Sequence, residues 1–266
     1  MSSLLKTPLP RLFLHDVPLR VGSPVPLGGA DHHYLTRVLR LGPGDHVLLL
    51  DGRGQVADAQ ITAISAQVVQ LQPQRIEAAP AAAPLPALHL LVGILKGERH
   101  DWVIEKATEL GAARILSLTC ARSIPSLSGD RGDRRQARWA RVALAAAKQC
   151  RRSVVPQISP PLAFADALSS CAEGPRLLFS EGAAPPLRCV LPPPDALRPD
   201  RAAIALPDPS PPAVSLLIGP EGGLTDEEQA HAVQAGFRPC SLGPTILRAE
   251  TAAIAALAAT ASLLQQ

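Results

Sequence analysis

The chain is poor in aromatic residues. Among its 266 residues there are two tryptophans, one tyrosine and four phenylalanines, so aromatic side chains make up only 3% of the sequence. Proteins that bind single-stranded nucleic acid without sequence preference stack successive bases on aromatic side chains. The composition therefore disfavours a base-stacking platform of that kind.

The sequence also lacks the spacing of a metal or disulfide framework. Its cysteines are odd in number and widely separated, without a C-x-x-C pair, which is typical of reduced thiols in a cytosol. Of the seven histidines only His32 and His33 are neighbours, so neither a metal site nor a catalytic triad is expected. The five cysteines are Cys120, Cys150, Cys171, Cys189 and Cys240.

Long apolar runs are absent as well. No stretch approaches the roughly 18 apolar residues that a membrane span needs, and the N-terminus has no unbroken apolar segment of a signal peptide. We therefore expect a soluble, cytoplasmic protein. The net charge of +3 is too small to indicate a partner by itself, because for RNA the clustering of the cations matters more than their sum.

Two glycine-containing loops in the last fifth of the chain are its most informative feature. Residues 216–223 read LLIGPEGG, and residues 242–251 read LGPTILRAET. The apolar run before the first loop, residues 214–218, is suited to a strand buried on both faces. Neither loop matches the G-x-G-x-x-G or G-x-x-x-x-G-K-[ST] pattern, which lowers the odds of a dinucleotide or nucleoside triphosphate.

A helix is predicted between the two loops. Thr225 and Glu228 have the spacing of a capping box, and Gly236 stands where a helix commonly ends. Residues 237–242 then return as a second strand. Strands joined in this way are parallel, so both loops should emerge at carboxyl ends of one sheet, where open α/β sheets bind ligands.

The first loop also carries an acidic residue, Glu221. A carboxylate among the backbone amides would repel a phosphate, so a cationic or neutral ligand fits better. S-adenosylmethionine, which has a sulfonium and no phosphate, meets that description. The alternative is that residues 219–223 form a structural turn and Glu221 is a solvated charge.

Basic residues recur along a predicted helix over residues 131–152. They lie three, four or seven positions apart on one stripe, with few acids to pair them, whereas apolar residues fill the other side. We interpret the stripe as a contact for RNA phosphates, which Arg37, Arg40 and Arg53 nearer the N-terminus extend. The stripe consists of Arg134, Arg138, Arg141, Lys148 and Arg152, and the apolar side of Trp139, Val142, Ala143, Ala146 and Cys150.

Two domains are expected. Residues 44–72 alternate turns and short strands, which indicates a small β-rich unit. Residues 78–86 are nearly all alanine and proline, and after them strands and helices alternate as in α/β folds. We place the domains at residues 1–76 and 87–266, with residues 77–86 as linker.

The chain resembles the ribosomal RNA small subunit methyltransferase E family of SPOUT (trefoil-knot) methyltransferases. The two C-terminal loops carry the most specific part of the likeness. Further segments that match are residues 38–41, 44–45, 51–52, 96–99, 106–111, 149–152 and 156.

The resemblance implies a fold and an activity. The fold is a PUA-like β-barrel domain that binds RNA, followed by a knotted α/β domain with a parallel sheet. The activity is S-adenosylmethionine-dependent methylation of N3 of a uridine in 16S ribosomal RNA of the small subunit, without a metal. The cofactor-binding residues that follow are Phe179, Leu217, Ile218, Gly219, Gly222, Leu242, Gly243, Ile246 and Leu247, and the RNA-binding residues are Arg37, Arg40, Arg53, Arg138, Arg141 and Arg152.

The chemistry singles out Arg248. Methyl transfer to N3 needs the uracil anion, and Arg248, beside the second loop, can donate to a uracil carbonyl as negative charge develops. Glu250 opens the final predicted helix, where the helix dipole favours a carboxylate, so a structural role is expected for it. Residues 251–264 are nearly all alanine and leucine, and this apolar helix agrees with the homodimer that the resemblance implies.

Two other functions stay open on the sequence. One is that the chain is a different SPOUT enzyme that methylates a ribose 2′-hydroxyl of transfer RNA. The β-rich N-terminal domain disfavours this alternative, because it matches the uridine-N3 family best. The other is a non-catalytic RNA-binding assembly factor, which would have no use for both glycine loops.

Overall fold

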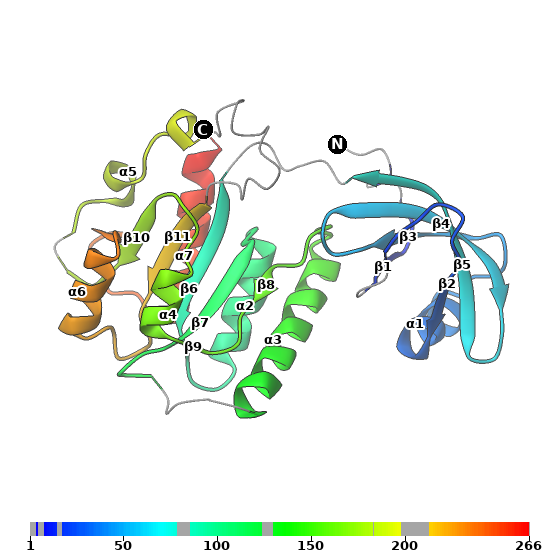
Figure 1. The fold of residues 1–266 in the computed structure, drawn as a ribbon, viewed down its shortest axis with the longest axis horizontal. Helices are drawn as coiled ribbons and strands as arrows, with labels where there is room; N and C mark the ends of the chain where they lie inside the picture. Colours follow the sequence, from blue (N-terminus) through cyan, green and yellow to red (C-terminus); the bar gives the residue numbers. More distant parts are fainter. Residues whose placement is uncertain are drawn as a thin grey trace. The chain divides into compact units, whose positions relative to one another are not determined.

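The chain forms two compact units (Figure 1). The first comprises Met1–Ala83 and Ala147–Val155, and the second Pro84–Ala146 and Pro156–Gln266. The computed structural model describes residues 4, 8–14, 18–78, 86–123, 130–182, 184–197 and 213–265. Strand β5 reaches Ala78, two residues into the segment expected to be linker, and residues 79–85 of that segment lie outside the described residues.

The first unit is built on a five-stranded sheet with strand order β1-β3-β4-β5-β2. β1 pairs with β3 in parallel, and the other neighbours are antiparallel. The β-rich character expected of this part is confirmed. Its elements are β1 (Arg11–Phe13), β2 (Val25–Gly28), α1 (Gly29–His33), the π-helical turn η2 (Tyr34–Val38), β3 (His46–Leu50), β4 (Gln55–Ile64) and β5 (Val68–Ala78).

The turn between β3 and β4 is held by a single carboxylate. Asp51 Oδ1 accepts hydrogen bonds of 2.8 Å from the backbone N–H groups of both Arg53 and Gln55. The same turn receives the segment that follows α3, because Val155 N donates to Gly52 O at 3.0 Å. Residues 147–155 therefore belong with this sheet although they lie far along the chain.

The second unit is an α/β fold around a parallel sheet, as expected. The strand order is β12-β10-β11-β6-β7-β8, with β9 also paired to β7, and all of these pairs are parallel. Its elements are β6 (Ala87–Gly93), α2 (Arg99–Glu109), β7 (Arg114–Thr119), α3 (Asp130–Gln149), β8 (Gln157–Ile158), β9 (Leu162–Ala163), α4 (Phe164–Ser169), β10 (Arg176–Phe179), α5 (Leu187–Val190), the 3-10 turn η3 (Pro194–Leu197), β11 (Ala213–Ile218), α6 (Asp226–Gln234), β12 (Arg238–Cys240) and α7 (Ala249–Leu264).

The sheet of the second unit is covered on both faces (Figure 1). Helices α4 and α6 pack on one face, where Phe164 and Ala232 join a core with Leu91 and Leu217. α7 lies against α2 and against β6 and β11. All six residues of β11 are buried, as predicted for a central strand between two helical layers.

Helix α6 begins and ends as its sequence predicts. Thr225 Oγ1 accepts from Glu228 N at 3.2 Å, and Thr225 N donates to Glu228 Oε2 at 2.9 Å, which is a complete capping box. Gly236 follows the helix with a φ of 85°. The strand after it, β12, is shorter than expected. It spans residues 238–240, whereas the sequence predicts a strand over residues 237–242.

A buried histidine links α2 to the sheet. His100 Nδ1 accepts from the backbone N–H of Leu95 at 3.4 Å, so Nε2 carries the proton and donates to Ser117 Oγ at 2.9 Å. The ring lies 4.5 Å from that of Trp139 between centroids. Burial, and secondarily the nearby Arg135, lower the pKa of His100 to about 3, which keeps the ring neutral.

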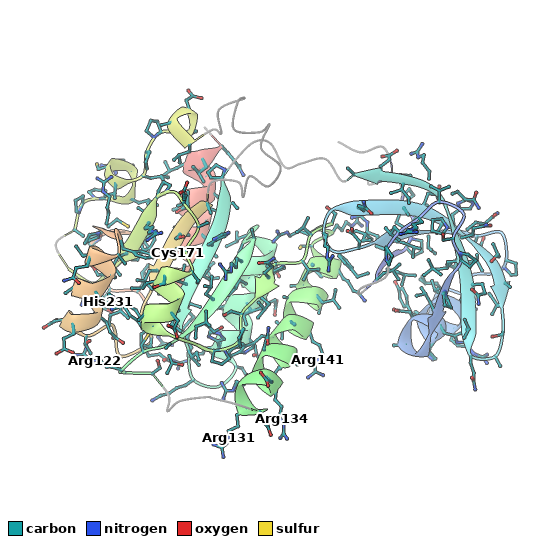
Figure 2. The ribbon with its side chains drawn as sticks, in the orientation of Figure 1. Arg122, Arg131, Arg134, Arg141, Cys171 and His231 are labelled. Carbon is teal, nitrogen blue, oxygen red and sulfur yellow. The ribbon has the colours of Figure 1, made fainter. Side chains whose placement is uncertain are left out.

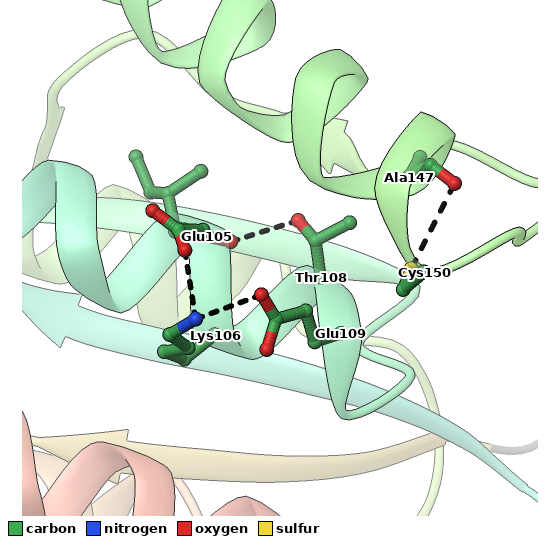
Figure 3. A network of polar contacts seen from close by, with 7 residues as sticks. Glu105, Lys106, Thr108, Glu109, Ala147 and Cys150 are labelled. Carbon is green, nitrogen blue, oxygen red and sulfur yellow. Dashed lines mark hydrogen bonds and ion pairs between the residues drawn. The ribbon is translucent and has the colours of Figure 1, made fainter.

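Opposite charges are paired along α2 (Figure 3). Lys106 Nζ lies 2.7 Å from Glu105 Oε1 and 2.8 Å from Glu109 Oε1. These hydrogen bonds raise the pKa of Lys106 to about 12.

In the described part of the chain, no helix is both long enough and apolar enough to cross a membrane.

Candidate functional site

The two glycine-containing loops meet in one pocket at the carboxyl edge of the parallel sheet. The pocket has a volume of about 920 Å³, within the range of small-molecule sites. It contains eight of the nine residues expected to bind a cofactor and also Arg248, the candidate catalytic residue. The eight are Phe179, Ile218, Gly219, Gly222, Leu242, Gly243, Ile246 and Leu247, and Arg248 lines the pocket with them.

Leu217 is the exception among the expected residues. Its side chain is fully buried in the core beneath α4 and α6, and the residue does not line the pocket. Neighbouring residues of a strand point to opposite faces, so Leu217 and Ile218 cannot both face the same side. The structure thus assigns Leu217 to the core.

The first loop is tied to the rest of the sheet by Glu221. Its Oε1 accepts a 2.8 Å hydrogen bond from the backbone N–H of Lys96, in the loop after β6. Arg99 Nη1 lies 3.7 Å from the same oxygen. Glu221 therefore anchors the first loop to the loop after β6, although the residue is exposed.

The loop after β7 also reaches the site. Arg122 Nη1 donates to Gly222 O at 3.1 Å, and Ala121 N donates to Glu228 Oε1 at 2.8 Å. Glu228 thus serves both the α6 cap and this neighbouring loop. A Cβ on Gly222 would come within 3.1 Å of the Arg122 Cβ, so glycine permits the close contact.

A second glycine lets the first loop pass close to the end of β6. Gly93 ends β6, and a Cβ built on it would lie 2.5 Å from the backbone nitrogen of Pro220. A separation under 3.0 Å to a backbone atom is not tolerated without movement of the chain. The first loop can therefore cross the end of β6 only because position 93 lacks a side chain.

The second loop is shaped by Ser241 and Gly243. Ser241 N donates to Pro185 O at 2.9 Å, which joins this loop to the segment after β10. Ser241 Oγ accepts from Gly243 N at 3.1 Å, and Gly243 has a φ of 132°, which favours glycine. Ile246 lies at the end of the loop with 77% of its surface exposed.

Charged groups of both signs face the pocket. Arg248 precedes α7, and among the described residues no carboxylate forms an ion pair with it. Glu250, in the first turn of α7, lies 3.8 Å from Arg99 Nε through its Oε1. The lining acids are Glu181, Glu221, Asp226 and Glu250, and the lining bases are Arg99, Arg122 and Arg248.

This arrangement suits a ligand with both an apolar part and charged groups. Ile218, Leu242 and Leu247 offer an apolar wall beside exposed backbone, and the acids favour a cation. Arg99, Arg122 and Glu181 were not among the predicted site residues. Arg122 and Glu181 follow β7 and β10, and Arg99 opens α2; of these, only Arg99 stands in a segment, residues 96–99, that the family resemblance marks.

The expected RNA-binding arginines are distributed over both units. Arg37, Arg40 and Arg53 are exposed on the first unit. Arg152 also belongs to that unit, and burial lowers its pKa. On α3, Arg138 forms an ion pair with Asp101, and Arg138 and Arg141 are both exposed. Figure 2 shows Arg131, Arg134 and Arg141 projecting from α3, and all three are exposed.

The apolar side predicted for α3 faces the core. Trp139 is 1% exposed, and Ala143 and Ala146 are buried as well. Elsewhere, within the part of the chain that the structure describes, no three histidine, cysteine or acidic residues gather as a metal site.

Comparison with known domain families identifies both units. A family model described as an RNA methyltransferase domain matches residues 82–261, and one described as an RNA methyltransferase PUA domain matches residues 27–74. The expected fold class, a SPOUT α/β domain with a parallel sheet after a PUA-like domain, is confirmed.

Individual relatives match over most of their length. Ribosomal RNA small subunit methyltransferase E of Synechocystis sp. is 35% identical over 248 residues, which cover 92% of this chain and 75% of the relative. Its counterpart in Bacillus subtilis is 30% identical over 236 residues, or 87% of each chain.

Solved structures agree with these matches. Ribosomal RNA small subunit methyltransferase E from Neisseria gonorrhoeae, bound to S-adenosyl methionine, is 30% identical with a TM-score of 0.77, covering 96% of this chain and 98% of the other. A putative methyltransferase of Legionella pneumophila, in complex with the same cofactor, is 28% identical with a TM-score of 0.78, covering 97% and 98%. The chain belongs to the ribosomal RNA small subunit methyltransferase E family.

Proposed function

We propose that this protein transfers the methyl group of S-adenosylmethionine to N3 of a uridine in 16S ribosomal RNA of the small ribosomal subunit, in the cytoplasm. The observation that carries the proposal is that the Gly219 and Gly243 loops line one shared pocket at the carboxyl edge of the sheet. Two relatives of the same fold were solved with this cofactor.

The pocket residues fit this cofactor. Ile218, Leu242 and Leu247 supply an apolar slot for an adenine, and backbone groups of both loops stand beside it. The four acids among the lining residues complement the positive charge of the ligand. When bound, S-adenosylmethionine supplies a methyl group activated by a sulfonium. The remaining residues of this proposed binding set are Phe179, Gly219, Gly222, Gly243 and Ile246.

Arg248 is the proposed catalytic residue. Uracil N3 holds a proton at neutral pH, so the site must favour the anion that remains when the proton leaves. A guanidinium beside a uracil carbonyl stabilises that anion as its charge develops. Arg248 lines the pocket, is exposed and has no ion-pair partner among the described residues, so its donors are available for a substrate.

The RNA would be held by arginines outside the pocket. Phosphate contacts supply most of the affinity of such interfaces and position the substrate. Arg141 on α3 and Arg37 and Arg40 on the PUA-like unit are exposed, which supports this role. Arg53, Arg138 and Arg152 complete the proposed set, with Arg138 also engaged by Asp101.

We also propose a homodimer that forms around α7. Its inner side buries Ala253, Leu257 and Leu264, whereas Thr251, Ala258 and Ser262 are exposed. Small residues of this kind allow two helices to approach closely.

No metal is required by the proposed chemistry.

The decisive experiment compares ribosomal RNA nucleosides of a deletion strain and its parent by mass spectrometry. We expect 3-methyluridine to disappear from 16S RNA and to return when the purified protein and S-adenosylmethionine are added to small subunits. Loss of a 2′-O-methyl nucleoside instead, or an unchanged nucleoside profile, would contradict the proposal.

A further inference from the structure

Trp102 is exposed beside the cofactor pocket. It is 42% accessible, whereas Trp139, the other tryptophan of the sequence, is 1% accessible. Trp102 lines an open recess of about 370 Å³ together with Glu98, Arg99 and Glu250. Arg99 and Glu250 line the cofactor pocket too, so the recess adjoins the place where a methyl donor would be held.

Arg99 keeps N–H donors that its two ion pairs do not use. Its Nη1 and Nε lie 3.7 Å from Glu221 and 3.8 Å from Glu250, both longer than a normal hydrogen bond, and its side chain is 49% exposed. A guanidinium carries five N–H donors in a planar fork. The two carboxylates therefore fix the position of Arg99 and leave donors for a ligand.

Glu250 keeps one carboxylate oxygen that no described residue uses as an acceptor. Among the described residues its Oε2 atom is buried and has no hydrogen-bond partner. A buried polar atom without a partner is rare and calls for an explanation such as a ligand. The terminal torsion of a glutamate is soft, so either oxygen can turn toward a group placed in the recess.

We propose that this recess holds the base of the target nucleotide, a uracil stacked on Trp102, an inference that rests on the function proposed above. The O4 carbonyl of the base accepts from Arg99, and the N3–H donates to Glu250. Cytosine carries an acceptor at N3 and an amine at C4, so both contacts would be unfavourable. The recess thus selects uracil over cytosine.

The same contact gives the N3 proton a destination. The N3–H bond breaks, the proton moves to a Glu250 oxygen, and the electron pair stays on N3. Glu250 becomes neutral as the base becomes negative, so the two do not repel each other. Arg99 and Arg248 then face the charge that spreads over the uracil carbonyls.

A second copy of the chain is the other conceivable occupant, and the lining argues against it. Three of the four lining residues, Glu98, Arg99 and Glu250, are charged. The cores of protein interfaces are depleted in charged residues. A nucleobase, which brings its own donors and acceptors, matches the recess better.

Tryptophan fluorescence tests the stacking directly. With S-adenosylhomocysteine bound, uridine 5′-monophosphate should quench the emission of the wild-type protein saturably, and cytidine 5′-monophosphate should require on the order of tenfold more ligand. Trp102→Phe, which leaves only the buried Trp139, should lose the response. In Glu250→Gln the preference for uridine should shrink, because an amide can donate as well as accept. Equal quenching by both nucleotides, or quenching that survives in Trp102→Phe, would overturn the proposal.

Kinetics with small ribosomal subunits provide the second test. Trp102→Leu should lower kcat/KM on the order of tenfold through KM, whereas Trp102→Phe keeps an aromatic face and most of the activity. S-adenosylhomocysteine affinity should not change. Val233→Ala removes another exposed apolar side chain, on α6 and outside the pocket, and is the matched control.

The outcomes separate this inference from the proposed function. Wild-type kinetics in Trp102→Leu would overturn the base recess alone. Conversion of a dimer to a monomer by Trp102→Leu would assign the recess to a second copy and overturn it as well. A wild-type protein that neither binds S-adenosylmethionine nor methylates the RNA would refute the proposed function itself.

Discussion

Glu221 Oε1 and the backbone nitrogen of Lys96 are joined by a 2.8 Å hydrogen bond, although 125 positions separate the two residues. The bond connects the loop after β11 to the loop after β6, two adjacent strands of the sheet. It therefore ties the glycine-rich loop to the neighbouring strand's loop.

Removing this carboxylate should weaken cofactor binding. Glu221→Ala leaves the Lys96 N–H without its acceptor, and a hydrogen bond to a charged group contributes about 1.5–3 kcal/mol. We expect S-adenosylmethionine affinity, measured by calorimetry, to fall by roughly ten- to a hundredfold. Glu221→Gln keeps an acceptor at the same place and should lose less. Wild-type affinity in Glu221→Ala would show that the loop holds its shape without the bond.

Replacing Arg248 should affect turnover more than binding. If its guanidinium stabilises the uracil anion, Arg248→Ala should lower kcat on the order of a hundredfold, which corresponds to about 3 kcal/mol. S-adenosylmethionine affinity should change little. Arg248→Lys, which keeps the charge but loses the planar fork, is the intermediate control. Full activity of the alanine variant on small subunits would remove Arg248 from catalysis, and a defect confined to affinity would place it in the binding shell.

Acid should destabilise the second unit through His100. Burial lowers the pKa of His100 from 6.5 to about 3, so its contribution to stability is complete above pH 6.5 and is lost as the pH falls toward 3. At pH 5 the loss amounts to roughly 2 kcal/mol. Urea unfolding of wild type and His100→Gln between pH 7.5 and 5 measures it.

The glutamine variant should be less stable at pH 7.5 but should lose less on acidification. A residual slope is expected, because burial also lowers the pKa of His89, to about 4. Identical pH dependence in wild type and His100→Gln would mean that other groups control the acid response.

The exposed arginines of α3 should supply non-specific affinity for RNA. Replacing Arg131, Arg134 and Arg141 together by alanine should weaken binding to small subunits and reduce the slope of log affinity against log salt, because fewer counterions are released. Titrations at several salt concentrations check this. Arg138→Ala, which breaks the ion pair with Asp101, should change the slope less. An unchanged slope in the triple variant would exclude this face from RNA contact.

Local features of the site could be predicted from the sequence. The capping box of Thr225 and Glu228, the buried strand β11 and the two glycine-containing loops depend on residues that are neighbours along the chain. Side-chain oxygens that bond to the next turn, and glycines that permit positive φ, act over a few positions. These features can therefore be recognised in the sequence without knowledge of the fold.

Long-range arrangement could not be predicted in the same way. β10 lies between β11 and β12, so the strands on either side of α6 are parallel but are not neighbours. A strand buried on both faces gives no indication of which side chains face a ligand, so the burial of the Leu217 side chain in the core could not be predicted from the pattern. Likewise, no spacing in the sequence pairs Arg138 with Asp101 or brings Arg99 and Arg122 to the pocket.

The contact between Gly93 and Pro220 gives the site a particular vulnerability. One added methyl group at position 93, a residue that does not line the pocket, would push the first loop away from the end of β6. The geometry of the binding loop thus depends on an adjacent strand, at a position where Pro220 occupies the space that a single side-chain carbon would need. A change there would disable the enzyme without altering any residue that touches its substrates.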